Sequence, residues 1–114
     1  QMAPTTLDGQ KSTTCIYGRN PEINGNPVKM CELLSTLTGP AYIARQSLCD
    51  VKHIVQAKKA IKKAFEHQIN GDGFTMVELL SSCPTNWHMT PEQALQYVAG
   101  DMEKLYPLGV FKEV

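Results

Sequence analysis

The sequence predicts an α/β fold built on one βαβ unit with parallel strands and flanking helices. Ala41–Ala44 forms a short apolar run that suits a first strand, and a long amphipathic helix is predicted from Val51 to about Asn70. Phe74–Leu80 is apolar on both faces except at Glu78, as expected for a parallel strand covered on both sides. A strand, a crossover helix and a strand in this order form a right-handed βαβ unit.

The chain begins with a polar segment, residues 1–26, called the leader below. It has no sustained periodicity and contains several turn-forming pairs. A loop of this length is unusual in a compact domain, so it is either functional, packed on something else, or a disordered leader. A first helix is predicted over Pro27–Thr38, with Pro27 at the first helical position and Gly39 after its end. Its apolar face comprises Val28, Cys31, Leu34 and Leu37.

Asp50 is placed to cap the long helix, and Asn70-Gly71-Asp72-Gly73 to end it. The apolar stripe of this helix comprises Val51, Ile54, Val55, Ala57, Ile61, Ala64, Phe65 and Ile69. Lysines occupy the rest of its surface, either as a solvated face or as a docking surface for an acidic partner: Lys52, Lys58, Lys59, Lys62 and Lys63.

A last helix is predicted to begin at the capping box Thr90-Pro91-Glu92-Gln93 and to end before Pro107. Its buried face comprises Ala94, Leu95, Val98, Met102 and Leu105. The tail, Leu108–Val114, is expected to add an edge strand or to cover a neighbour. The chain is thus expected to be a single partial domain over residues 1–114, divided into the leader (1–26), a helix–strand–helix–strand core (27–80), and a loop, last helix and tail (81–114).

Composition excludes several functions. Eleven basic and eleven acidic residues cancel, so no whole-chain charge favours nucleic acid or an anionic membrane. No apolar run approaches the roughly 20 residues that span a bilayer. The four cysteines include no C-x-x-C pair, which argues against a self-contained zinc knuckle. Without a secretion signal we expect reduced thiols and a cytoplasmic location, although an even cysteine count leaves a disulfide framework open.

Cys83 follows the second strand directly and precedes Pro84-Thr85-Asn86-Trp87. In open α/β sheets ligands bind at the carboxyl ends of the strands, so a thiolate here is able to ligate a metal. Its local context alone still favours a structural thiol. An iron–sulfur cluster needs four thiolates, and Cys15, Cys31 and Cys49 are poorly placed to supply the others. If Cys83 is a ligand, its partners are expected outside this chain. His53, His67 and His88 show no metal-binding spacing.

Three stretches together resemble the β subunit of 2-oxoacid:ferredoxin oxidoreductases. Gln1-Met2-Ala3-Pro4-Thr5-Thr6, with Gly9–Thr14, is similar to the loop that follows the thiamine diphosphate motif of those subunits. Ser82–Trp87 is similar to the segment that supplies the last cysteine of a 4Fe–4S cluster, and Tyr106–Lys112 resembles the carboxyl-terminal signature. The resemblance covers essentially all 114 residues. It implies that the fold is the carboxyl-terminal part of a thiamine-diphosphate-binding fold.

The resemblance also implies cofactors, partners and site residues. The intact subunit would hold thiamine diphosphate with Mg²⁺ and one 4Fe–4S cluster. It would work with an α subunit, and in some enzymes γ and δ subunits, with coenzyme A and ferredoxin as co-substrates. Cys83 would be the fourth cluster ligand, and Gln1, Met2, Pro4 and Thr5 would lie near thiamine diphosphate. The reaction would be the oxidative decarboxylation of a 2-oxoacid to an acyl-CoA, with 2-oxoglutarate favoured and 2-oxoisovalerate or pyruvate as alternatives.

One tripeptide in the sequence resembles the magnesium motif of thiamine diphosphate enzymes but departs from its spacing. Thiamine diphosphate enzymes bind magnesium through a G-D-G motif with an asparagine about 25–30 residues later, but after Gly71-Asp72-Gly73 the nearest asparagine, Asn86, is too close. We therefore predict that these residues form a helix-to-strand turn. The magnesium motif and three cluster cysteines are expected before Gln1, so the chain by itself is predicted to be an inactive fragment. A non-catalytic α/β interaction domain is the alternative.

Overall fold

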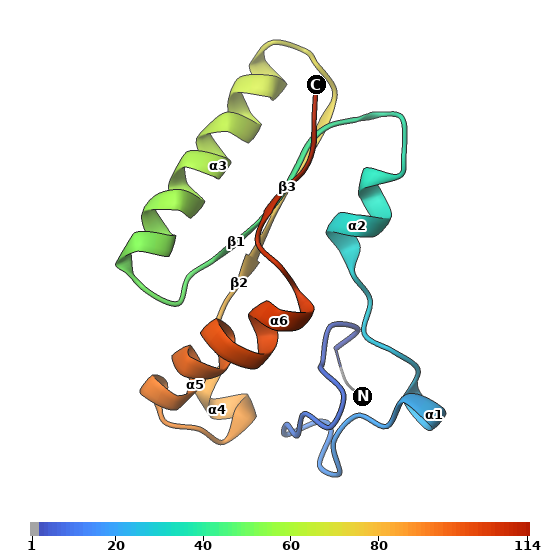
Figure 1. The fold of residues 1–114 in the computed structure, drawn as a ribbon, viewed down its shortest axis with the longest axis vertical. Helices are drawn as coiled ribbons and strands as arrows, with labels where there is room; N and C mark the ends of the chain where they lie inside the picture. The colour runs from blue at the N-terminus through green and yellow to red at the C-terminus, as the bar shows by residue number, and fades with distance from the viewer. Residues whose placement is uncertain (1–2) are drawn as a thin grey trace.

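A computed structural model describes residues 3–114 and contains one mixed, three-stranded sheet (Figure 1). The strand order is β2-β1-β3, so β1 (Pro40–Ser47) is central. β2 (Phe74–Leu80) pairs parallel to β1, and β3 (Gly109–Glu113) pairs antiparallel to its other edge. The predicted α/β class and the edge strand in the tail are both confirmed.

The βαβ unit is formed by β1, α3 (Val51–Ile69) and β2, as predicted. The Asp50 carboxylate caps α3 by accepting the backbone N–H of His53 at 2.8 Å. The face of α3 that covers the sheet is lined by buried alanines, whose small side chains allow close packing: Ala57, Ala60 and Ala64. On this side of the sheet Tyr42, Ala44 and Ala64 form one core cluster.

Much of the predicted apolar stripe of α3 remains uncovered. Phe65 is 64% exposed and Ile69 is 84% exposed. The expectation that β2 would be covered on both sides is also wrong, because β2 is an edge strand and only its last residue, Leu80, is buried. An edge strand has no neighbour beyond it to complete the layer under the outer face of the crossover helix.

The turn at Gly71-Asp72-Gly73 joins α3 to β2, as the sequence predicts. Gly71 has φ 73° and Gly73 has φ 138°, which are conformations that side chains disfavour. A Cβ at Gly73 would also lie 2.8 Å from the backbone oxygen of Gly39. The glycines are therefore explained by turn geometry and close backbone approach.

The first predicted helix is shorter than expected. The residues of Pro27–Thr38 form only α2 (Met30–Ser35), and a separate short helix, α1 (Pro21–Asn24), lies within the leader. Pro27 is therefore not the first helical residue. Val28 instead donates its N–H to the backbone oxygen of Pro4 at 2.9 Å, a tertiary contact that holds this stretch outside the helix. α2 lies on the face of the sheet opposite α3 (Figure 1).

The last helix is interrupted by one π-helical turn. α5 (Pro91–Tyr97) begins at the predicted capping box, with Thr90 and Gln93 bonded reciprocally. It continues as the π-helical turn η1 (Val98–Met102) and ends as α6 (Glu103–Leu105). Ala94 and Val98 are fully buried, as predicted for the inward face, whereas Leu95, predicted for the same face, is 36% exposed. A further one-turn helix that the sequence did not predict, α4 (Pro84–Trp87), follows β2.

The leader is folded around Arg19, which is 7% exposed. Its guanidinium donates to backbone oxygens on both sides of it in the sequence: Ala3, Pro4, Thr6, Asn24, Gly25 and Asn26. Arginine suits this position because its rigid fork carries five N–H donors. Of the alternatives for this segment, the disordered one is wrong for residues 3–26, because the structure shows them folded through contacts within the chain itself.

Candidate functional site

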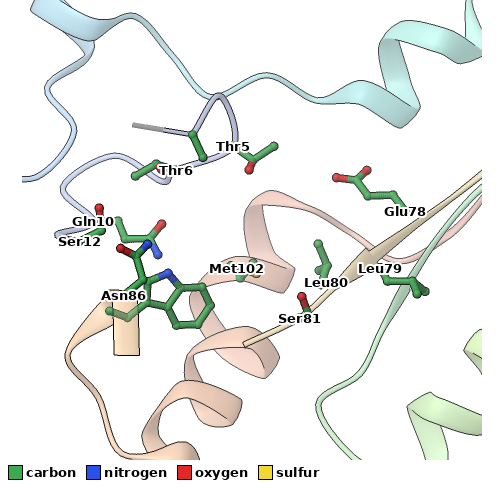
Figure 2. A pocket seen from close by; sticks show the side chains of 12 residues that line it. Thr5, Thr6, Gln10, Ser12, Glu78, Leu79, Leu80, Ser81, Asn86 and Met102 are labelled. Carbon is green, nitrogen blue, oxygen red and sulfur yellow. The ribbon is translucent and has the colours of Figure 1, made fainter. Parts of the chain in front are cut away.

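A cavity of about 220 Å³ lies at the carboxyl end of β2, between the leader and the helices that follow the strand (Figure 2). It is the place where an open α/β sheet binds ligands. The leader, the end of β2 and the helical region after it each contribute to its lining: Ala3, Thr5, Thr6, Gln10, Ser12, Glu78, Leu79, Leu80, Ser81, Asn86, Trp87 and Met102. One wall is thus rich in hydroxyl and amide groups, and another is apolar.

Hydrogen bonds hold the leader over this cavity. The backbone N–H of Thr13 donates to the backbone oxygen of Asn86 at 3.0 Å and to its side-chain oxygen at 3.2 Å. The Tyr106 hydroxyl donates to the backbone oxygens of Val28 at 3.0 Å and Thr5 at 3.4 Å. Tyr106 is buried, and burial raises the pKa of its phenol, so it remains a donor. The cavity is therefore closed on the leader side by specific contacts.

Glu78 is the one ionisable side chain among the described residues of the lining, and its carboxylate faces the leader in Figure 2. Its Oε2 accepts from Arg45 Nε at 3.0 Å and from Cys31 Sγ at 3.0 Å. Arg45, whose side chain is fully buried, also pairs with Glu32 through Nη2–Oε2 at 2.7 Å. The charge of Glu78 is thus neutralised from behind the cavity wall.

This ion-pair network changes the chemistry of its members. The hydrogen bond from Arg45 lowers the pKa of Glu32. Burial, with the hydrogen bond to Glu78, raises the pKa of Cys31 to about 12. Arg45 is further sandwiched by aromatic rings, with its guanidinium carbon 4.9 Å from the ring centres of both Tyr106 and Phe111. Cys31 is consequently a neutral structural thiol.

Cys83 lies beside the cavity with its thiol side exposed. It occupies the position before α4, and its backbone oxygen accepts the N–H of Trp87 at 3.0 Å. His88 closes the same turn with φ 56°, a left-handed conformation. Two neighbours of Cys83 in sequence, Ser81 and Asn86, line the cavity. An exposed thiol on a tightly folded turn at a strand end is suited to reach a ligand that approaches from outside.

The other three cysteines do not form a metal-binding group with Cys83 in the described residues. Within residues 3–114, the one group of three side chains able to share a metal ion is Cys49, His53 and Glu103, which does not include Cys83. Cys31 is bonded to Glu78, and Cys15 lies in the leader. All four cysteines are thiols rather than disulfides. The assignment of Cys83 as a cluster ligand therefore remains a prediction.

The structure partly brings together the predicted cofactor-binding residues. Thr5 lines the cavity, whereas Pro4 is exposed and its backbone oxygen is used within the fold by Val28 and Arg19. Gln1 and Met2 lie outside the described residues. The sequence did not single out Gln10, Ser12 or Met102 as lining residues. Glu78 could have been identified from the sequence, because it is the single charged residue in the predicted strand Phe74–Leu80.

Known proteins similar to this chain are oxidoreductase subunits. The chain is 47% identical over 113 residues to the ketoisovalerate oxidoreductase subunit VorA of Methanothermobacter thermautotrophicus, covering 99% of this chain and 24% of that subunit. It is 31% identical over 123 residues to the 2-oxoglutarate synthase subunit KorB of Archaeoglobus fulgidus, covering 99% of this chain and 42% of that subunit. The 2-oxoacid:ferredoxin oxidoreductase subunit beta of Saccharolobus solfataricus is 34% identical over 87 residues, covering 75% of this chain and 24% of the relative.

No family model matches the chain, and no solved structure matches it. The relatives define a class, namely the subunits of oxidoreductases for 2-oxoacids. The chain is a homologue of 2-oxoacid:ferredoxin oxidoreductase subunits, and the resemblance noted in its sequence is thereby confirmed. It spans about a quarter of the length of the VorA relatives, with 24% of the subunit matched. No described helix is both long and apolar enough to cross a membrane.

Proposed function

We propose that this chain is part of the subunit of a 2-oxoacid:ferredoxin oxidoreductase that binds thiamine diphosphate and one 4Fe–4S cluster. The enzyme would decarboxylate a 2-oxoacid oxidatively, form an acyl-CoA and pass electrons to ferredoxin. One observation carries the proposal: the leader and the Cys83 turn both line one cavity and are bonded through Thr13 and Asn86, which are 73 residues apart in sequence. The identity with oxidoreductase subunits across the chain supports the same reading.

The residues present fit an iron–sulfur cluster as one ligand of four. Such clusters are held by cysteine thiolates, and Cys83 is an exposed thiol at the end of a parallel strand. The N–H and hydroxyl groups of the Cys83 turn would supply hydrogen bonds that tune the cluster's potential. The remaining three thiolates would come from outside residues 3–114, since Cys15, Cys31 and Cys49 lie in other surroundings.

The residues present fit part of thiamine diphosphate. Sites for ligands of this size occupy about 300–1,000 Å³, so a cavity of about 220 Å³ would hold one portion of it. The hydroxyl groups of Thr5, Thr6 and Ser12 would donate hydrogen bonds to a phosphate or to the reacting end. Mg²⁺ would need other ligands, because the Glu78 carboxylate is already paired with Arg45.

When bound, thiamine diphosphate supplies the electron sink for decarboxylation, and a 4Fe–4S cluster carries the electrons singly. The chain's own residues would orient the bound cofactor and enclose it. Leu80 and Met102 would keep water from the apolar wall, while the leader would close the opposite side through Thr13 and Tyr106. Arg45 would hold the Glu78 carboxylate in a fixed position in the cavity wall.

The test of this function is cluster assembly in the complete subunit after incubation with iron and sulfide. The unsubstituted subunit is expected to show the visible absorption of a 4Fe–4S cluster, and Cys83→Ser is expected to lose most of it. Cys15→Ser, which changes a thiol in the leader, is the matched control and should retain the absorption. If Cys83→Ser and Cys15→Ser assemble the cluster equally well, Cys83 is not a ligand.

We propose a branched-chain 2-oxoacid as the substrate, rather than the 2-oxoglutarate that the sequence resemblance favoured. The ketoisovalerate oxidoreductase relative is 47% identical, against 31% for the 2-oxoglutarate synthase relative. The described lining residues also include no lysine or arginine to bind a distal carboxylate. In the assembled enzyme, ferredoxin reduction should be several-fold faster with 2-oxoisovalerate than with 2-oxoglutarate or pyruvate. The reverse order would contradict the proposal while leaving the enzyme class intact.

A further inference from the structure

A second cluster of metal-ligating side chains lies at the carboxyl end of β1. Cys49, His53 and Glu103 each offer one ligand atom, and the three atoms lie within 4.8 Å of one another. Cys49 precedes α3, and His53 is in the first turn of that helix. Glu103 is the first residue of α6, directly after the π-helical turn. Two segments about 50 residues apart in sequence therefore converge on one point.

The spacing of two of the donor atoms, those of Cys49 and His53, is close to that in a tetrahedral zinc site. With Zn–S near 2.3 Å and Zn–N near 2.0 Å, tetrahedral angles place sulfur and nitrogen about 3.5 Å apart. The observed distance from Cys49 Sγ to His53 Nδ1 is 3.4 Å. Cys49 lies directly before the cap residue Asp50, and His53 lies in the first turn of α3, so the start of the helix brings the two side chains together. Glu103 then completes three protein ligands.

A fourth donor is adjacent. Asp50 Oδ1 lies 2.7 Å from His53 Nδ1, and Asp50 Oδ2 lies 3.9 Å from Cys49 Sγ. Asp50 is held in place as the cap of α3, because its Oδ1 also accepts the His53 backbone N–H. An oxygen donor beside Nδ1 is able to enter the coordination shell as the fourth ligand once Nδ1 binds the metal in place of its hydrogen bond to Asp50.

The charge of the cluster favours a bound cation. Two carboxylates and a thiol meet at one imidazole, and within residues 3–114 no lysine or arginine forms an ion pair with Asp50 or Glu103. The thiol packs against the core formed by Leu7, Leu80, Val98 and Tyr106, whereas the His53 side chain is 30% exposed. The cluster is thus supported from inside and reachable from solvent.

We propose that Cys49, His53 and Glu103 bind one Zn²⁺ ion, separately from the cavity between the leader and Cys83. A thiolate, an imidazole and a carboxylate form a mixed sulfur, nitrogen and oxygen set that suits Zn²⁺. Mg²⁺ and Ca²⁺ select oxygen ligands and do not match it. The ion would join the start of α3 to the end of the π-helical turn, two segments that also pack against the same core cluster. This site does not depend on the proposed enzymatic function.

The test is titration of the full chain with Zn²⁺ in competition with a chromophoric zinc indicator, under reducing conditions. One equivalent is expected to bind. Cys49→Ser and Glu103→Gln should each weaken binding more than about tenfold, at least the loss seen for outer-shell changes at metal sites. Glu92→Gln is the matched control, because it changes an exposed carboxylate outside the cluster, and it should bind as the unsubstituted chain does. Cys83→Ser tests whether zinc binds at the exposed thiol instead. Unchanged affinity in Cys49→Ser, or a loss confined to Cys83→Ser, overturns the assignment.

A second measurement needs no substitution and so does not depend on variants that fold. Iodoacetamide alkylation of the unsubstituted chain is followed by mass spectrometry with and without one equivalent of Zn²⁺. Zinc should slow the modification of Cys49 more than about tenfold and leave the exposed Cys83 unaffected. Equal rates at Cys49 with and without zinc, or protection of Cys83 in its place, would refute the site.

Discussion

The backbone N–H of Thr13 donates to the backbone oxygen of Asn86 at 3.0 Å and to the Asn86 side-chain oxygen at 3.2 Å. This contact joins two of the three stretches of the chain that carry the family resemblance, the leader and the turn that contains Cys83. A residue of each of these stretches, Ser12 and Asn86, lines the same cavity.

Replacing Asn86 by Ala is expected to loosen the leader at this contact. The substitution removes one of the two acceptors of the Thr13 N–H, and a partly exposed hydrogen bond is worth about 1 kcal/mol or less. Hydrogen exchange at the Thr13 amide should accelerate by up to about fivefold. Asn86→Asp retains the acceptor oxygen and should exchange as the unsubstituted chain does, and equal acceleration in both variants would contradict this explanation.

Arg19→Lys is expected to release the leader from the rest of the fold. Lysine keeps the charge but offers three donors on a flexible stem, so several of the carbonyl oxygens now bonded to Arg19 would lose their partner. The local cost is about 1–3 kcal/mol. Limited proteolysis should cleave residues 3–26 faster while β1 and α3 remain protected. Lys11→Gln, at an exposed leader position, is the control, and resistance of Arg19→Lys equal to that control would argue against a central function for the guanidinium.

Arg45→Met should destabilise the whole fold. Methionine fills similar volume but leaves Glu78 and Glu32 without their cation, and breaking such a buried pair costs about 3 kcal/mol or more. Urea unfolding measures the free energy of unfolding of each variant. A triple variant that also carries Glu32→Gln and Glu78→Gln should regain part of the loss, because no unpaired charge remains. If the triple variant is less stable than Arg45→Met alone, charge pairing is not the main contribution of Arg45.

The cysteines are expected to differ strongly in reactivity. Cys31 is buried with a pKa raised to about 12, so roughly one molecule in ten thousand carries its thiolate at pH 8. Cys83 is exposed. Alkylation of the native chain at pH 8 should therefore label Cys83 first, and Cys31 only after unfolding in urea. Mass spectrometry of digests distinguishes the sites, and early labelling of Cys31 would contradict the buried hydrogen bond to Glu78.

The contribution of His67 to stability should fade as the pH rises. Hydrogen bonds to Asp72 and then to Glu113 raise the pKa of His67. A folded-state pKa above the unfolded value means that protonation stabilises the fold fully below the unfolded pKa. The stabilisation is then lost as the pH rises through the folded pKa. The difference in urea midpoint between the unsubstituted chain and His67→Gln should thus be larger at pH 5.5 than at pH 8.5. An equal difference in urea midpoint at the two pH values would contradict this explanation.

Local signals in the sequence predicted most of the fold. Asp50 and Thr90 cap helices through bonds within three residues, so their effect is visible in sequence. The start of α2 was mispredicted because the N–H of Val28 is taken by Pro4, a contact that exists only once the leader has folded. The same holds for the site. Cys83 was predicted from its place after a strand and Thr5 from the family resemblance of the leader, whereas Gln10 and Met102 reach the cavity through tertiary packing.

The π-helical turn Val98–Met102 determines on which side of the helix axis the residues after it lie. A π-helical turn contains one more residue than an α-helical turn, and one residue corresponds to about 100° of rotation around an α-helix. Deleting Gly100 would allow α5 to run on as a regular helix and would swing Glu103 and Tyr106 to a different side of it. The one extra residue thus rotates the end of the helix. This rotation places Glu103 near Cys49 and Tyr106 against Arg45 and the leader.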